Sequence, residues 1–206
     1  MSLRASAAAA LAAGFLMVLA GCGAARPVKY YSLAAPQVSP SGQKLDVSLL
    51  VGHFRAPTMY RDTRIAYRMG PNELGLYEDH RWVAAPVLIV EEMVLHTLRR
   101  SGNYKSVQLL ASNAKGDYVV RGRIEHFEEV DDGPLSARVA LHMSLYDQKS
   151  GETVWSQSYS QDEPAASKNV ASVAAALDKN LQQGILQLVS GMNEYLAAHP
   201  RPAAAN

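Results

Sequence analysis

Residues 118–147 read YVVRGRIEHFEEVDDGPLSARVALHMSLYD, and this stretch decides the fold of the chain. Apolar and polar side chains alternate over residues 118–127 and again over residues 135–145, which is typical of half-buried strands. The segment DDGP at residues 131–134 lies between them and favours a turn. A third alternating segment covers residues 153–159. We therefore expect an antiparallel meander with one face in the core and one face in water.

Two helices are expected to pack against this sheet. Residues 86–100 begin with a proline, end with Arg99 and Arg100 and are followed by Gly102, which is the order of signals that starts and stops a helix. Residues 167–198 repeat apolar side chains every three to four positions, which predicts one long amphipathic helix. One stripe of that helix is expected to complete the core, and the alternative is a groove that binds lipid.

Further strands are predicted by the apolar patterns at residues 45–51, 63–69 and 74–77. Together these elements predict an α/β fold: a single sandwich domain over residues 30–199. Its sheet is expected to be mixed but mostly antiparallel, with a mid-chain helix and a long C-terminal helix. Residues 200–206 are rich in proline and alanine and are expected to form a flexible tail.

Composition limits the classes of function. The 206 residues carry a formal net charge of +1, which argues against nucleic-acid binding because such proteins normally carry a basic excess on one face. A single cysteine excludes an intramolecular disulfide framework. Hydrophobic residues make up 48% of the chain, which is enough for a packed core.

The N-terminal residues have the layout of a bacterial lipoprotein signal peptide. Residues 1–21 join a short start, with a positive charge at Arg4, to an apolar run that ends in Leu-Ala-Gly before Cys22. An apolar residue, two small residues and a cysteine form a lipobox. The sequence therefore predicts cleavage before Cys22, a diacylglycerol on its thiol and an N-terminal acyl chain. The alternatives are an ordinary signal peptide, or a membrane anchor that happens to contain a cysteine.

The residue after Cys22 predicts where the protein is anchored. It is Gly23 rather than aspartate, which by the common sorting rule for Gram-negative lipoproteins favours the periplasmic leaflet of the outer membrane. Residues 22–29 form the acylated tether, and the seven residues from Gly23 to Lys29 span at most ~23 Å. We therefore expect the domain to lie close to its membrane.

No catalytic motif is visible in the sequence. It contains no nucleophile elbow, phosphate-binding loop or HExxH zinc motif. Glu92 and His96 lie four residues apart on the expected helix, but a helical hydrogen bond explains that spacing. His126 and His142 fall on neighbouring strands, and two imidazoles without a third ligand make a poor zinc site. We expect no metal, no catalytic residue, no enzymatic activity and no cofactor besides the acyl groups on Cys22.

Two acidic pairs could be mistaken for the carboxylates of a glycoside hydrolase. They are Glu128 with Glu129 and Asp131 with Asp132. Because each pair is adjacent in sequence, we expect both to lie in a solvated turn.

Residues 52–62 break the strand pattern and are the candidate docking loop. Aromatic, methionine and arginine side chains are enriched at protein interfaces. We therefore expect exposed partner-binding residues here: Phe54, Arg55, Met59, Tyr60 and Arg61. The alternative is a loop that folds back and buries its aromatic side chains.

Five short motifs follow one another along the chain: YYSL at 30–33, PTMYRDTRI at 57–65, HRW at 80–82, YVVRGRIEHF at 118–127 and DQKSGETVW at 147–155. Their order and spacing resemble the ABC-type transport auxiliary lipoprotein family, which includes the paraquat-inducible protein C-like lipoproteins. The resemblance covers residues 30–198, roughly. None of these motifs is catalytic.

This resemblance implies a compact α/β sandwich without an active site. It also implies an accessory role in ABC transport systems whose periplasmic component carries a mammalian-cell-entry (MCE) domain and which move lipids between the inner and outer membranes. The implied partners are that MCE-domain protein and its ABC permease. A ring-like homo-oligomer is implied as well.

The leading hypothesis is therefore a non-enzymatic docking subunit of a lipid-transport system, anchored to the outer membrane through Cys22. Three alternatives stay open. They are a periplasmic carrier that binds an acyl chain between helix and sheet, an assembly lipoprotein for another outer-membrane complex, and an envelope hydrolase.

Overall fold

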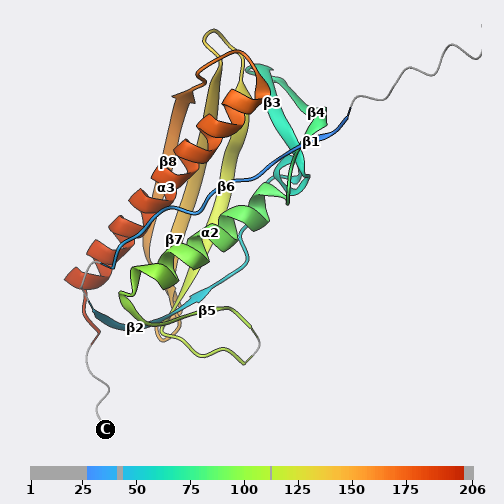
Figure 1. Cartoon of the computed structure of the whole chain (residues 1–206). Helices are drawn as coiled ribbons and strands as arrows, with labels where there is room; N and C mark the ends of the chain where they lie inside the picture. The colour runs from blue at the N-terminus through green and yellow to red at the C-terminus, as the bar shows by residue number, and fades with distance from the viewer. Residues whose placement is uncertain (1–26, 41–43, 112, 202–206) are drawn as a thin grey trace, which may run out of the picture.

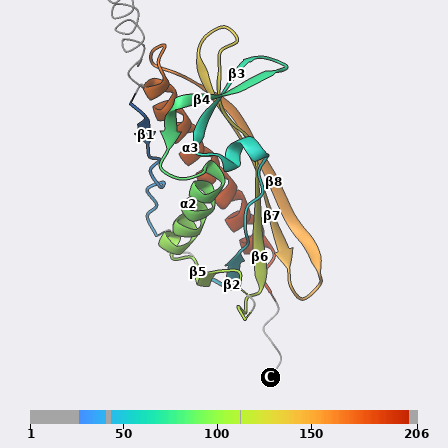
Figure 2. The ribbon, with the colours of Figure 1, turned by 90° about the vertical axis from the view of Figure 1, so that its right-hand side faces the viewer.

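In the part of the chain that the structure describes, eight strands form one mixed sheet, and two helices lie on one of its faces (Figures 1 and 2). The computed structural model describes residues 27–40, 44–111 and 113–201. The strands are β1 Lys29–Tyr31, β2 Leu45–Val51, β3 Arg64–Gly70, β4 Glu73–Trp82, β5 Tyr104–Leu109, β6 Tyr118–Val130, β7 Ser136–Asp147 and β8 Glu152–Pro164. The helices are α2 Pro86–Ser101 and α3 Val170–Ala198, with a 3-10 turn η1 at Thr58–Arg61. This α/β architecture confirms the predicted fold class.

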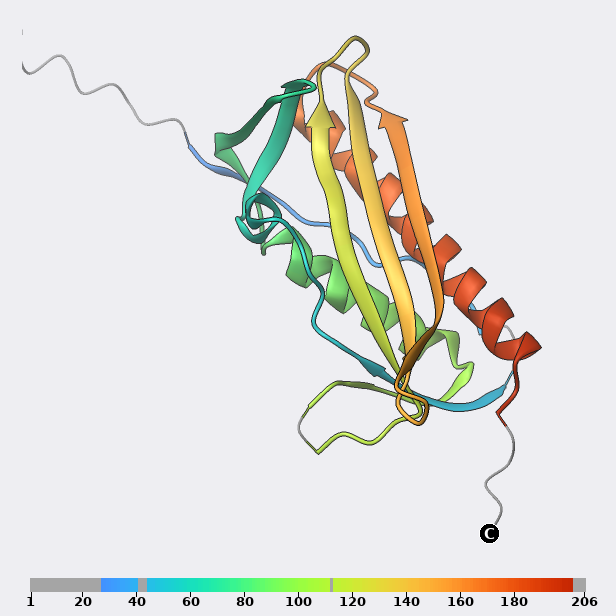
Figure 3. The same ribbon diagram turned by 180° about the vertical axis from the view of Figure 1, so that it is seen from behind.

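The meander predicted from the alternating segments is present as β6, β7 and β8. Both pairs are antiparallel, and β6 pairs with β7 from Tyr118 opposite Asp147 to Val130 opposite Ser136, with one bulge after Ile124. Seen from behind in Figure 3, these strands form a face that no helix covers. We call it the helix-free face.

One edge of β6 is paired by an interrupted strand. β2 runs parallel to the start of β6, and β3 runs parallel to its end. Between them the Arg55 N–H donates to the Gly122 carbonyl at 2.9 Å, and the Ile124 N–H donates to the Arg55 carbonyl at 2.8 Å. The chain therefore follows β6 through the region that was expected to be a loop, while η1 projects from this edge.

Residues that commonly start or stop helices lie at the ends of α2 and at the start of α3. α2 has Pro86 in its first turn and is closed by Gly102, whose φ of 63° is the left-handed conformation that glycine adopts without strain. α3 begins after Asn169, whose side chain accepts a hydrogen bond from the Ser172 N–H at 2.9 Å. The start at Val170 is three residues later than expected.

A buried polar clamp holds α3 on the meander. Asn180 is fully buried, and its side-chain amide donates to the carbonyls of Ala137 and Gln161 at 2.9 and 2.8 Å. The Tyr159 hydroxyl donates to the Asn180 side-chain oxygen at 2.6 Å. Gly184 leaves room for the Tyr159 ring, since a Cβ there would lie only 2.6 Å from a ring carbon. This contact fixes the register of helix against sheet.

The segment after β1 crosses the helix layer between α2 and α3 (Figure 1). The Ala34 N–H donates to Asp178 of α3 at 2.8 Å. Leu33 and Ala35 instead line a cavity against α2. The N-terminal part of the domain therefore bridges the two helices.

One expectation about chain segments needs correction. Glu128 and Glu129 were expected in a solvated turn but lie in β6 and are 0% and 5% exposed. The reason is that β3 and β7 both pair with the end of β6, so the strand extends to Val130.

The expected flexible tail, residues 200–206, is described only as far as Arg201. The Arg201 guanidinium is ion-paired with Asp117 and lies 2.6 Å from Asp147, and it stacks over the Tyr118 ring. Arg201 is therefore held to the domain, and the flexible tail stays a prediction. The predicted signal peptide (1–21), Cys22 and the tether before residue 27 lie outside the described residues.

Candidate functional site

Two arginines on the helix-free face are each neutralised by a carboxylate. Arg68 donates from Nε to Glu128 at 2.7 Å, and Arg138 reaches Asp162 with two hydrogen bonds of 2.8 and 2.7 Å. The Arg138 hydrogen bonds lower the pKa of Asp162 below its usual value. In each pair a carboxylate compensates the positive charge of the arginine.

Arg55 and Arg123 form an exception on the same face. They are partners in an isolated parallel bridge between the interrupted strand and β6, so their side chains start on the same side of the sheet. Both are exposed, and in the described parts of the chain neither comes within ion-pair distance of a carboxylate. Arg121, two residues before Arg123, stacks its guanidinium 4.1 Å from the Tyr146 ring centroid. We call Arg55, Arg121 and Arg123 the arginine row.

Like charges directly opposite each other on neighbouring strands destabilise a sheet. The positions of Arg55 and Arg123 are therefore electrostatically unfavourable for the isolated domain. An anionic partner would relieve that repulsion, which makes the arginine row a candidate docking surface. Arg123 was missed in the sequence because the strand pattern only assigned it to a wet face, and its pairing with Arg55 depends on a contact across 68 residues of chain.

The predicted docking residues differ in their exposure to solvent. Arg55 and Arg61 are exposed, as expected. Tyr60 is only 2% exposed and donates its hydroxyl to Glu128 at 2.5 Å, so the expectation that it is a surface residue was wrong. Phe54 and Met59 are half-buried and pack against the core. Whether these residues bind a partner stays a prediction.

The loop folds back because the sheet offers room for its aromatic rings. A Cβ at position 122 would lie 2.0 Å from the Phe54 ring, so Gly122 is what allows that ring to lie on β6. The Phe54 N–H also donates to Glu91 of α2 at 2.8 Å. Burial and the Glu128 carboxylate together raise the pKa of the Tyr60 hydroxyl, which keeps it protonated as a donor. The alternative left open from the sequence is therefore correct for Phe54 and Tyr60.

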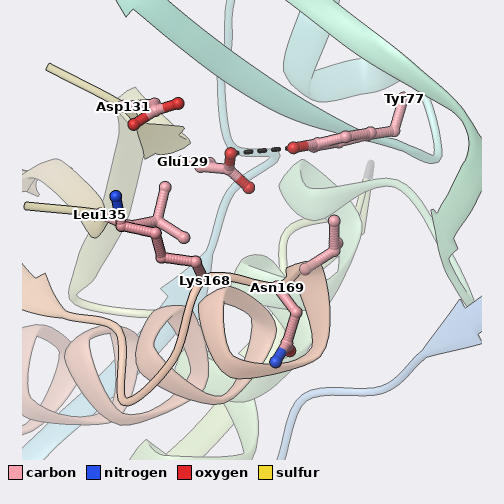
Figure 4. Close-up of a pocket in the computed structure, with 7 residues that line it drawn as sticks. Tyr77, Glu129, Asp131, Leu135, Lys168 and Asn169 are labelled. Carbon is pink, nitrogen blue, oxygen red and sulfur yellow. Dashed lines mark hydrogen bonds between the residues drawn. The ribbon is translucent and has the colours of Figure 1, made fainter.

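A polar pocket of about 280 Å³ lies where the end of β6 meets the start of α3 (Figure 4). The Tyr77 hydroxyl donates to Glu129 at 2.8 Å, and the other Glu129 oxygen is buried with no hydrogen-bond partner among the described residues. Burial raises the pKa of Glu129, the Tyr77 hydrogen bond lowers it, and the nearby Asp131 raises it. Lys168 and Asn169 complete the polar rim. The lining therefore combines two carboxylates, a phenol hydroxyl, an amine and a side-chain amide.

A second cavity, also about 280 Å³, is mainly apolar and lies against α2. It is lined by Leu33, Ala35, Val83, Ala84, Ile89, Met93, Glu92 and His96. Glu92 and His96, the helix pair considered as metal ligands, therefore lie on the rim of an apolar cavity.

The described histidines do not form a metal centre. His126 lies opposite Ala140 and His142 opposite Arg123, because a bulge after Ile124 shifts the register of β6. His126 approaches Glu128 at 3.1 Å and His142 approaches Ser158 at 3.0 Å. No group of three His, Cys, Asp or Glu side chains in the described ranges could hold a metal ion. Of the helices described, neither is long and apolar enough to cross a membrane.

The described residues therefore form an α/β sandwich with two cavities and a row of exposed arginines. The chain belongs to the family of ABC-type transport auxiliary lipoprotein components, whose model matches residues 31–189. This match confirms the resemblance read from the short motifs.

Solved structures show the same fold. The crystal structure of protein XCC0632 from Xanthomonas campestris is similar with a TM-score of 0.71 and 23% identity, over 81% of this chain and 99% of that one. A crystal structure of an uncharacterized protein is similar with a TM-score of 0.64 and 11% identity, over 81% and 99% of the two chains. No curated protein matches the sequence.

Proposed function

We propose that this protein is a non-enzymatic docking subunit of an MCE-type lipid-transport system, anchored by its acylated Cys22 to the periplasmic leaflet of the outer membrane. The observation that carries the proposal is the family match, which covers residues 31–189 and therefore nearly the whole folded domain. The lipobox before Cys22 supports the anchor, and Gly23 supports the outer membrane as its destination. Diacylglycerol and an N-acyl chain together give stable attachment, which one chain would not.

The docking surface we propose is the arginine row. Arg55 and Arg123 are exposed neighbours without a carboxylate in the described structure, whereas Arg68 on the same face is paired with Glu128. An acidic patch on the MCE-domain protein would supply the missing counter-charges. Such charge complementarity raises the association rate and selects the partner, and salt weakens it.

The proposal is tested by affinity capture of the acylated protein from gently solubilised envelopes, with mass spectrometry of what it retains. Recovery of an MCE-domain protein with its ABC permease supports the proposal. Recovery of a different outer-membrane complex, without those two proteins, would overturn it in favour of an assembly lipoprotein. The Cys22→Ser variant should lose acylation and membrane attachment.

Charge reversal tests the proposed surface separately. We expect Arg55→Glu and Arg123→Glu to lower capture several-fold at low salt while thermal unfolding changes little. Lys149→Glu is the matched control, because Lys149 is an exposed cation in the turn between β7 and β8. Equal capture by all three variants would exclude the arginine row as the docking surface.

A lipid carrier is the second candidate, because the apolar cavity beside α2 lies between Leu33 and Met93 and opens at the surface. It predicts phospholipid that remains with the purified protein in a fixed molar ratio. Replacing Ala35, at the cavity wall, with Trp should then release the lipid. A preparation free of lipid would leave only the docking role.

A further inference from the structure

Four exposed apolar side chains lie where the tether enters the domain. Val28 and Tyr30 are 43% and 65% exposed, and Val83 and Leu88 are 61% and 57% exposed. They account for nearly half of the large apolar side chains that the described structure leaves exposed. We call these four residues the tether-end patch.

Strand pairing brings the members of the patch together. β1 pairs in parallel with the end of β4, and Tyr30 is the partner of Arg81. The Val83 N–H then donates to the Tyr31 carbonyl at 2.9 Å, so Val83 lies beside β1 although it is more than 50 residues away in sequence. Leu88 follows in the first turns of α2, and Figures 1 and 2 show β1 beside the end of β4.

Alternation along β1 explains why the patch is not part of the core. Tyr31 points inward and packs against Trp82, with ring centroids 6.3 Å apart. Val28 and Tyr30 precede it and are exposed, and Tyr30 lies on the opposite side of the strand from Tyr31. The apolar cavity beside α2 continues the patch, because Val83 also forms part of its wall.

The length of the tether indicates that a lipid surface covers this patch. Val28 lies six positions after Cys22, and six positions of extended chain span at most ~20 Å. An acyl group on Cys22 therefore keeps Val28, where the patch begins, within ~20 Å of the anchored leaflet. Aromatic and aliphatic side chains at that level lose water by entering the interfacial region, where tyrosine is favoured because one end of its ring is polar.

We propose that the tether-end patch is a membrane-facing surface, in which Val28, Tyr30, Val83 and Leu88 insert into the phospholipid leaflet that carries the anchor. The acyl groups alone would let the domain rotate about its tether. Insertion of the patch fixes one orientation, with β1 and the start of α2 against the membrane. This inference rests on the proposed anchoring at Cys22.

The test uses the acylated full-length mature protein in phospholipid vesicles. The only native cysteine is Cys22, whose thiol carries the lipid, so Val83→Cys and Leu88→Cys each add one free thiol for an environment-sensitive fluorophore. Leu109→Cys is the matched control, because Leu109 is also an exposed apolar residue, 46% exposed, and lies in β5 away from β1 (Figure 1). Brominated lipids then quench any fluorophore that enters the bilayer.

We expect brominated lipids to quench the fluorophores at positions 83 and 88 at least twice as strongly as the one at position 109. Equal quenching at all three positions would overturn the inference. Protection of positions 83 and 88 from aqueous iodide without quenching by lipid would also overturn it, since a protein would then cover the patch. Failure of the protein to float with vesicles is a different result, because it refutes the anchoring itself.

Discussion

Substitutions of Tyr60 distinguish a role of this residue in folding from a role in partner binding. Its side chain is 2% exposed, and its hydroxyl bonds Glu128, which is fully buried. Replacing a buried aromatic side chain with Ala costs about 3–5 kcal/mol, and loss of a hydrogen bond to a charged group costs about 1.5–3 kcal/mol. We therefore expect Tyr60→Ala to lower the free energy of unfolding by about 5 kcal/mol and Tm by about 10–20 °C.

Tyr60→Phe keeps the ring and removes only the hydroxyl. Glu128 would keep Arg68 at 2.7 Å and His126 at 3.1 Å, so its charge stays compensated. We expect a loss of about 2 kcal/mol and a fall in Tm of about 4–8 °C. Partner capture below the Tm should equal that of the parent protein, because the hydroxyl faces the interior.

Thermal and urea unfolding followed by circular dichroism measure both variants, and the envelope capture assay is run where each is folded. A Tyr60→Ala protein within about 1 kcal/mol of the parent would refute the burial of this ring. A Tyr60→Phe protein with nearly unchanged Tm but greatly reduced capture would refute the reasoning in another way, because the hydroxyl would then belong to the interface.

Substitutions at three further sites, Asn180, Glu129 and Gly102, test the fold and the polar pocket. Asn180→Ala removes three hydrogen bonds between α3 and the sheet and should cost about 3 kcal/mol in urea unfolding, against less than about 0.5 kcal/mol for the exposed Gln187→Ala on the same helix. Glu129→Gln should raise the free energy of unfolding at pH 8 and raise it much less at pH 4. The folded state raises the pKa of Glu129, so the protonated carboxyl stabilises the fold below the ordinary pKa of 4.5, and this stabilisation is lost as pH rises through the folded-state pKa. Glutamine stays neutral at both pH values and avoids that loss. Unfolding midpoints at the two pH values check this, and a larger gain at pH 4 would contradict it. Gly102→Ala should cost about 1–2 kcal/mol because of its left-handed φ, and Gly102→Asn should cost less; equal stability of all three proteins would show that the cap is not strained by a side chain.

Local patterns predicted most of the secondary structure. The alternation in residues 118–127 and 135–145, and the helix signals at Pro86 and Gly102, correspond to β6, β7 and α2. These patterns are reliable because they follow from the two-residue repeat of a strand and the 3.6-residue repeat of a helix. The order of short motifs likewise identified the family.

The errors arose where distant segments meet. Tyr60 resembles an interface residue in sequence, and only the end of β6, with Glu128 across the fold, makes it a buried donor. Glu128 and Glu129 resemble a solvated turn, and only pairing with β3 and β7 extends the strand that buries them. No local signal reports such pairing.

The class of fold and the family could be inferred from the amino-acid sequence alone, and so could the prediction of an acyl anchor, because each depends on short-range periodicity or on the order of motifs along the chain. The tertiary structure decided which residues are available to act. In the tertiary structure Arg55 lies beside Arg123, Val83 lies beside β1, and Tyr60 is buried in the core. The physical reason is that side-chain burial and charge pairing depend on contacts between residues far apart in sequence, which form only when the sheet closes around its core.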